Sequence, residues 1–229
     1  MSFSWTQLIP GVGHEYAHVA TAAIATTVLV GIAVKARADL GTNEASVVPA
    51  QKFGVRAIFE MITGYIDKLA VSVIGPEEGR RLVPLFASFF TFILFNNLVG
   101  LLPGVTPATE NLNTTFSMAI FVFVMYNIMG VRANGVGYLK HFLGPVWWLA
   151  PFMLVLELIS HAVRPLSLGM RLGFVMLGDH TVLGVALDLV PLGVPILFYM
   201  LAIIVSLIQA IVFTLLSMVY VAMATAHEH

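Results

Sequence analysis

The sequence predicts an all-α integral membrane protein, because it is strongly apolar and its apolar runs are long. Of its 229 residues, 59% are hydrophobic and only 10% are charged. The mean hydropathy of +0.95 lies far above the range of soluble globular proteins. No polar linker is long enough to separate two folded units, so residues 1–229 are expected to form a single polytopic membrane domain.

Composition also excludes several functional classes. The chain has no cysteine, which excludes disulfides, thiolate metal sites and cysteine catalysis. Its net charge of -1 gives no reason to expect a nucleic acid partner. The N-terminal tail, 1–17, lacks the basic segment that precedes the apolar core of a signal peptide, so we expect no cleavage.

The first membrane helix is expected at about 18–34, where an alanine-rich apolar span is followed by basic residues. The next stretch mixes basic side chains with regularly spaced apolar ones. This pattern predicts an amphipathic helix over about 50–75 that lies along the membrane interface. Two further membrane helices are expected at 82–102 and 114–131, separated by a polar loop.

The last two apolar runs, about 145–188 and 195–226, differ in length, and the first is too long to stand upright in a bilayer. At about 1.5 Å per residue it would measure ~65 Å against a hydrocarbon core of ~30 Å. It is therefore either one steeply tilted helix or a hairpin of two spans that turns near Arg164 to Arg171.

The distribution of basic residues favours the tilted helix. A hairpin would place its doubly basic turn outside, against the tendency of basic loops to remain in the cytoplasm. If the run at 145–188 crosses once, the chain has five crossings in all, with an outer N-terminus and a cytoplasmic C-terminus. The two long C-terminal helices then form a hairpin. Seven Lys and Arg residues define the cytoplasmic side of the first crossing: Lys35, Arg37, Lys52, Arg56, Lys68, Arg80 and Arg81.

The stretch from Leu156 to His180 is strongly apolar yet carries several ionisable side chains. Glu157, Arg164 and Arg171 follow at intervals of seven residues, so they share one stripe of a helix, whereas His180 lies about half a turn out of phase. A charge at the bilayer centre costs from roughly 3 to more than 10 kcal/mol, so these groups are expected to face a partner or an aqueous cavity. The alternative is a structural Glu157–Arg164 pair, with Arg171 reaching a lipid headgroup.

Other polar side chains within or next to the apolar runs are candidates for lining a polar channel. For the asparagines at 96 and 97, packing is favoured over channel lining, because buried amides between membrane helices commonly hydrogen-bond to a neighbour. The candidates are Asn96, Asn97, Asn113, His161, Arg164 and Ser206.

Five segments of the chain carry a recognisable pattern: FNNLVGLLPG (95–104), NLNTTFSMA (111–119), LELISHAVRPLSLGMRL (156–172), GDH (178–180) and LIQAIVFTLLSMVYVAMA (207–224). Taken together, these segments resemble subunit a of the rotary F-type ATP synthases, the membrane stator that faces the ring of c subunits. The resemblance covers nearly the whole chain.

This resemblance implies a non-catalytic, proton-translocating stator with two offset half-channels, which couples ion flow to ring rotation and ATP synthesis. In such a subunit, Arg171 would be the essential arginine opposite the c-ring carboxylate. The implied partners are the c ring, the peripheral-stalk b subunits, the rest of the complex and the lipid bilayer, with no cofactor. We expect a multi-pass protein of the bacterial plasma (inner) membrane. The implied ion-translocation residues are Arg171, Glu157, Ser160, Asp179, His180, Gln209 and Tyr220.

By this resemblance, Glu157 and Ser160 match the cytoplasmic half-channel and His180 the outer one. There are also departures from the family pattern. After the essential arginine and a leucine, the family usually has phenylalanine, a small residue and asparagine, whereas this chain has glycine, phenylalanine and valine at 173–175. Gly100 and Ala202 stand where some members carry ionisable side chains, so His180, Asp179 and water are expected to do more of the proton transfer.

Three other functions remain as alternatives. An intramembrane hydrolase is disfavoured because Ser160 and His161 are adjacent on a helix and diverge by about 100°, and the chain has no GxSxG or HExxH motif. A haem carrier is disfavoured because His161 and His180 lie on one helix and cannot clamp a haem from both sides. A free-standing ion-coupled secondary transporter would usually show an internal repeat, which this sequence lacks.

Overall fold

The computed structural model describes residues 17–40, 54–102, 104–135, 137–138, 148–189 and 194–225. Most of the predicted N-terminal tail, the basic loop around Lys140 and most of the last turn lie outside these residues. The labelled elements are α1 (Ala17–Leu40), α2 (Val55–Val73), α3 (Pro76–Gly100), the 3-10 helix η4 (Ala108–Glu110), α4 (Leu112–Asn134), α6 (Ala150–Leu189) and α7 (Val194–Thr225).

Five helices of the described chain are long and apolar enough to cross a membrane: α1, α3, α4, α6 and α7. None of the labelled elements is a strand, so the predicted all-α membrane fold is confirmed within the described residues. The helix α2 is the amphipathic segment and carries charged residues along its length. Of the expected range 50–75, residues 50–53 lie outside the described residues, and the helix ends at Val73.

Helix ends differ from the apolar runs for a physical reason. The helix α3 begins at Pro76 rather than at Leu82, because proline is favourable at the first helical position and two glutamates in the first turn interact well with the helix dipole. A prediction based on hydropathy begins with the apolar residues and therefore leaves this charged first turn out of the helix. At the start of α4, the side chain of Asn111 accepts a hydrogen bond from the backbone N–H of Asn113 at 2.9 Å.

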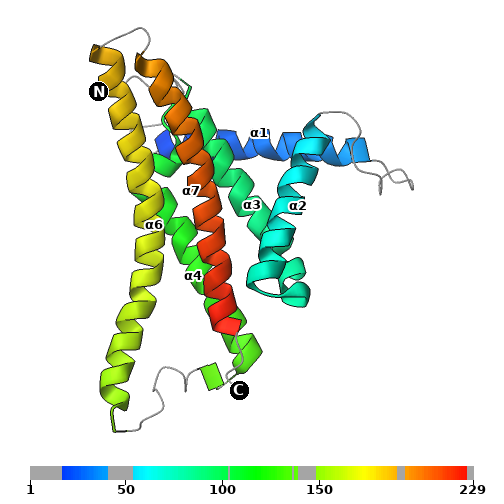
Figure 1. The fold of residues 1–229 in the computed structure, drawn as a ribbon, viewed down its shortest axis with the longest axis vertical. Coiled ribbons are helices and arrows are strands. Elements are labelled where there is room, and N and C mark those ends of the chain that lie inside the picture. Colours follow the sequence, from blue (N-terminus) through cyan, green and yellow to red (C-terminus); the bar gives the residue numbers. More distant parts are fainter. Residues whose placement is uncertain are drawn as a thin grey trace.

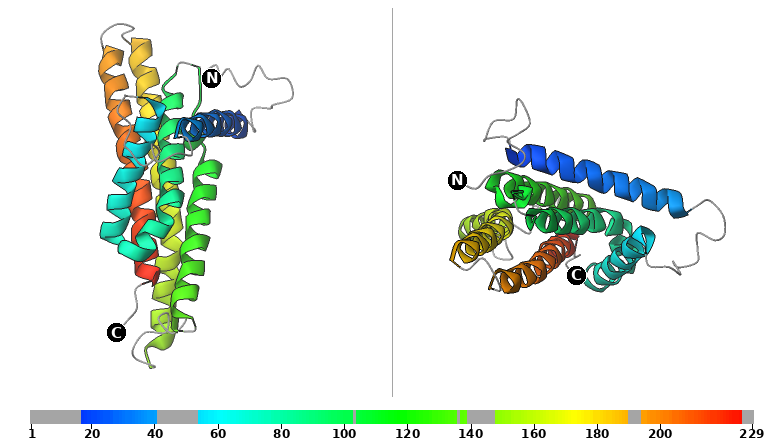
Figure 2. Two further views of the ribbon diagram at one scale, coloured as in Figure 1. Left: turned by 90° about the vertical axis from the view of Figure 1, so that its right-hand side faces the viewer. Right: turned by 90° about the horizontal axis from the view of Figure 1, so that it is seen from above.

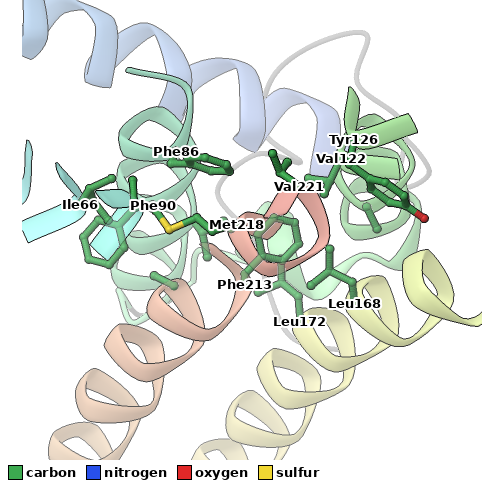
Figure 3. Close-up of a cluster of buried hydrophobic side chains, with 14 of the residues drawn as sticks. Ile66, Phe86, Phe90, Val122, Tyr126, Leu168, Leu172, Phe213, Met218 and Val221 are labelled. Atoms are coloured by element: carbon green, nitrogen blue, oxygen red, sulfur yellow. The ribbon is translucent and has the colours of Figure 1, made fainter. Parts of the chain in front are cut away.

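The hairpin of α6 and α7 lies side by side with α3 and α4, and α2 packs on α3 (Figures 1 and 2). Apolar side chains from α2, α3, α4, α6 and α7 form one buried cluster between these helices (Figure 3). The outward faces of α6 and α7 expose many large apolar side chains, as expected of surfaces that meet lipid or another subunit. The labelled core residues are Ile66, Phe86, Phe90, Val122, Tyr126, Leu168, Leu172, Phe213, Met218 and Val221.

Unlike the other long helices, α1 lies crosswise to α6 and α7 (Figures 1 and 2). The helix α6 has 40 residues and continues through Pro165, so no hairpin turn occurs between Arg164 and Arg171. It is therefore ~60 Å long, twice the ~30 Å hydrocarbon core, whereas the 24 residues of α1 extend ~36 Å. In one bilayer, α1 and α6 cannot both stand upright.

Two glycines bring α6 close to α4 and thereby set its rotation. A Cβ atom at Gly169 would lie 3.0 Å from Cδ1 of Phe116, and one at Gly173 would lie 2.7 Å from Cδ2 of Leu112. Small residues allow membrane helices to approach in this way. Because Gly173 lies about 200° around the helix from Arg171, close packing of the glycine face on α4 turns Arg171 away from it.

Candidate functional site

Arg171 lies on the outer face of α6. Its side chain is exposed, as are those of Met170 and Phe174, whereas Leu172 on the inner side is completely buried. Ser160 is also exposed and lies eleven residues earlier, about three turns away on the same face. The structure thus presents a permanently charged guanidinium on an otherwise largely apolar surface.

Towards the start of α6, Glu157 lies between two basic side chains. Its Oε1 is 3.9 Å from Nη2 of Arg164 and also 3.9 Å from Nδ1 of His161. The guanidinium of Arg164 lies over the ring of Tyr220 on α7, 5.9 Å from the ring centroid, which is within cation–π range. The Arg164 guanidinium therefore links Glu157 of α6 to the last helix.

His161 faces α4 rather than the surface that carries Arg171. Its side chain is buried, with Nε2 3.0 Å from Oδ1 of Asn127, and this same oxygen accepts a hydrogen bond from the Tyr138 hydroxyl at 2.9 Å. Burial raises the pKa of Tyr138, so the hydroxyl remains a donor. Because an amide oxygen only accepts, Nε2 must carry the proton in its bond to Asn127. This arrangement serves packing between α4 and α6.

At the other end of α6, a partly open cavity of about 470 Å³ is lined by the loop after α3, η4, α6 and α7. Its lining includes Glu110 from η4, His180 from α6 and Tyr199 from α7. The Nδ1 atom of His180 is 3.9 Å from Oε2 of Glu110. Burial raises the pKa of Glu110, which lies outside the membrane-spanning helices.

Sequence reasoning missed three of these residues: Glu110, Asn127 and Tyr138. For Glu110 a signal was present, because it is the only acidic residue between Glu78 and Glu157. Neither Asn127 nor Tyr138 was singled out, since their importance depends on contacts with His161 that no local pattern encodes.

The asparagines of α3 make packing contacts. The Thr109 hydroxyl in η4 donates a 2.6 Å hydrogen bond to Oδ1 of Asn97, which helps to hold η4, and with it Glu110, against α3. The side-chain amide of Asn96 donates to the Phe92 carbonyl of its own helix at 2.9 Å. Neither asparagine is among the described residues that line the cavity at His180.

The remaining expected site residues are distributed over three helices. Ser206 and Gln209 are buried on the inner side of α7, and Asn113 is exposed in the first turn of α4. Asp179 is partly buried and is not among the described residues that line the cavity at His180. At Gly100 a Cβ atom would lie 2.5 Å from Cβ of Pro107, so no larger side chain fits there unless Pro107 moves.

Comparison with known proteins finds relatives that match this chain over most or all of its length. The family model described as ATP synthase A chain matches residues 18–222. The ATP synthase subunit a of Bdellovibrio bacteriovorus is 63% identical over 230 residues, covering 100% of both chains. The chain belongs to the ATP synthase subunit a family. Subunit a 1 of Syntrophotalea carbinolica is 43% identical over 93% of this chain and 87% of its own. Subunit a of Geobacter sulfurreducens is 39% identical over 90% of this chain and 89% of its own.

Membership in the subunit a family confirms the resemblance inferred from the five sequence segments. Subunit a is a membrane-sector component of the ATP synthase complex and is not its catalytic subunit. With five apolar helices among its described residues and bacterial relatives, the chain is a multi-pass bacterial membrane protein that takes part in ATP synthesis and proton transport. A component of this complex differs from a free-standing transporter, a hydrolase or a haem carrier.

Within this subunit, replacement of Arg164 by lysine is expected to be well tolerated. Lysine keeps the charge near Glu157, and partly exposed ion pairs of this kind contribute about 1 kcal/mol or less. Arg164→Met should be more harmful, because it leaves Glu157 with His161 as its other described basic neighbour. The amount of assembled complex and the rate of ATP synthesis in membrane vesicles measure both effects. Equal losses in the two variants would contradict a role that depends on charge alone.

Proposed function

We propose that this chain is the proton-translocating stator of an F-type ATP synthase, with Arg171 facing the carboxylates of a ring of c subunits. The observation that carries this proposal is the exposed guanidinium on the apolar face of α6. In the described part of the chain, no acidic side chain lies within ion-pair distance of it. A charge on a membrane-facing surface needs an opposite charge from a partner, which a rotor carboxylate would supply.

The mechanism follows from the electrostatics of a carboxylate that moves between lipid and Arg171. A carboxyl group exposed to lipid must be neutral, whereas a nearby positive charge favours its ionised form. A proton from the outside therefore neutralises one rotor carboxylate, and the ring turns. A carboxyl group that arrives from the other side loses its proton to the cytoplasm before it meets Arg171. The arginine thus separates the two half-channels.

The spacing along α6 supports two offset half-channels. His180 lies nine residues beyond Arg171, or ~13.5 Å along the helix, and Glu157 lies fourteen residues before it, or ~21 Å. The outer path would use the cavity at His180, with Asp179, Gln209 and buried water as further groups. The inner path would use Glu157 and Ser160, with Tyr220 nearby.

In this proposal the chain is one polytopic membrane domain with five crossings, an outer N-terminus and a cytoplasmic C-terminus. The seven basic residues from Lys35 to Arg81 support this orientation. The crosswise packing of α1 supports an upright α1 and strongly tilted α6 and α7. The hairpin of α6 and α7 would face the c ring, and peripheral-stalk b subunits would hold the stator against rotation.

Labelling of a single cysteine tests this topology. Asp188 is exposed at the end of α6, and the chain has no native cysteine, so Asp188→Cys introduces the single reactive thiol. A cysteine at 188 should react with an impermeant thiol reagent added from outside and should be protected in inverted vesicles. A cysteine at Arg81 is the matched probe and should show the opposite pattern. Reaction of position 188 only from the cytoplasmic side would overturn five crossings.

Purification of the chain with its partners tests the function itself. A tagged chain extracted in mild detergent should bring down a ring of small helical-hairpin subunits together with the catalytic sector. Reconstituted into vesicles with an imposed proton gradient, the purified assembly should make ATP. Recovery of the chain alone, with proton-coupled solute uptake, would instead support a secondary transporter.

A further inference from the structure

The outer cavity brings together two titratable groups from segments far apart in the sequence. Glu110 comes from η4 and His180 from α6, with 3.9 Å between Oε2 and Nδ1. Both line the cavity of about 470 Å³, so water has room to reach them. This distance is longer than a direct hydrogen bond, but a single water molecule or a small side-chain rotation bridges it.

Glu110 is held in a setting that favours proton exchange. Its Oε2 atom is buried and has no hydrogen-bond donor in the described part of the chain. A carboxylate without donors is costly to bury, and burial accordingly raises the pKa of Glu110. Its backbone is held against α3, because the adjacent Thr109 is hydrogen-bonded to Asn97 of that helix.

We propose that Glu110 is a second proton carrier of the outer half-channel and exchanges one proton with His180. This inference rests on the proposed stator function and adds a residue to its outer path. A proton from outside water first binds a carboxylate oxygen of Glu110. The O–H bond then breaks as an N–H bond forms on the His180 imidazole, directly or through one water. The resulting imidazolium releases the proton of its other ring nitrogen inward, and the pair regains its starting state once the neutral imidazole returns to its first tautomer.

The other groups around the cavity fit this role less well. Asp179 adjoins His180 but diverges from it by about 100° on the helix, and it is not among the described lining residues. Tyr199 contributes a phenolic hydroxyl from α7, which serves as a hydrogen-bond partner for water in the cavity. From α3 and the following loop, the described lining includes no ionisable side chain apart from Glu110.

The test uses the whole ATP synthase in membrane vesicles, with proton flux through the membrane sector measured after the catalytic sector is removed. Glu110→Gln keeps the size of the side chain but cannot carry a proton, and it should lower the flux about tenfold. Glu110→Asp should restore part of the flux. Asp188→Asn removes an exposed carboxylate near the same end of α6 and should leave the flux unchanged.

Coupling between the two residues is tested by combining substitutions. If Glu110 and His180 act in one path, Glu110→Gln should add little to the loss caused by His180→Ala. Unchanged flux in Glu110→Gln, or an aspartate variant as impaired as the glutamine variant at equal complex levels, would overturn the proposal. Additive losses in the double variant would also contradict it.

An Arg171→Ala variant separates this inference from the function on which it rests. Loss of coupling in Arg171→Ala together with normal flux in Glu110→Gln would contradict only the proposed role of Glu110. Preserved coupling in Arg171→Ala would instead remove the stator mechanism itself. Reduced flux in Glu110→Gln with lost coupling in Arg171→Ala is the result expected if both are correct.

Discussion

Replacing Arg171 by alanine is expected to abolish proton-driven ATP synthesis and to open a passive proton leak. Without the guanidinium, nothing at this position favours the ionised rotor carboxylate, so neutral carboxyl groups pass from one half-channel to the other. Protons then cross without coupled synthesis. Membrane vesicles allow ATP synthesis and passive proton flux to be measured on the same preparation.

Lysine at position 171 should be nearly as damaging as alanine. It keeps a positive charge, but it lacks the planar guanidinium and can lose its proton when desolvated. Arg164→Lys is the matched control, because Arg164 lies one heptad earlier on the same helix. Synthesis that survives in Arg171→Ala, at normal levels of assembled complex, would exclude the proposed mechanism.

Hydropathy was sufficient to predict the five apolar helices, because each exceeds the thickness of the membrane core. The single long α6 could also be inferred, since the positions of the basic residues disfavour a hairpin. The crosswise placement of α1 could not, because it depends on contacts between helices that are distant in sequence. The start of α3 was misplaced because charged residues belong to its first helical turn.

The same distinction applies to the candidate site. Heptad spacing along α6 was enough to group Glu157 with Arg164, and the nine-residue step was enough to turn His180 away from Arg171. Their partners were not predictable in this way. Glu110 meets His180 across a gap of 70 positions, and Asn127 meets His161 across 34, so both contacts depend on tertiary packing.

Substitution of Gly173 by phenylalanine, the usual family residue at this position, is expected to prevent normal assembly of this chain. Even a Cβ atom there would lie 2.7 Å from Cδ2 of Leu112 and 3.1 Å from Oγ1 of Thr115. Thr115 is completely buried, so a full aromatic ring would have to push α4 away from α6. Overpacking a core usually lowers the free energy of unfolding by about 1–3 kcal/mol, and a whole aromatic ring lies at the upper end of this range.

The order of glycine and phenylalanine at 173–174 therefore follows the packing of this chain. Gly173 is buried against α4, whereas Phe174 is 49% exposed on the outer side of α6. The amount and thermal stability of the detergent-extracted complex should fall sharply in Gly173→Phe. They should change little in Gly184→Phe, because a Cβ atom at Gly184 meets nothing within 4 Å. Adding Leu112→Ala to Gly173→Phe should restore part of the loss, since it removes the nearest obstructing atoms. Normal stability of Gly173→Phe alone would show that α4 and α6 do not approach each other at this glycine.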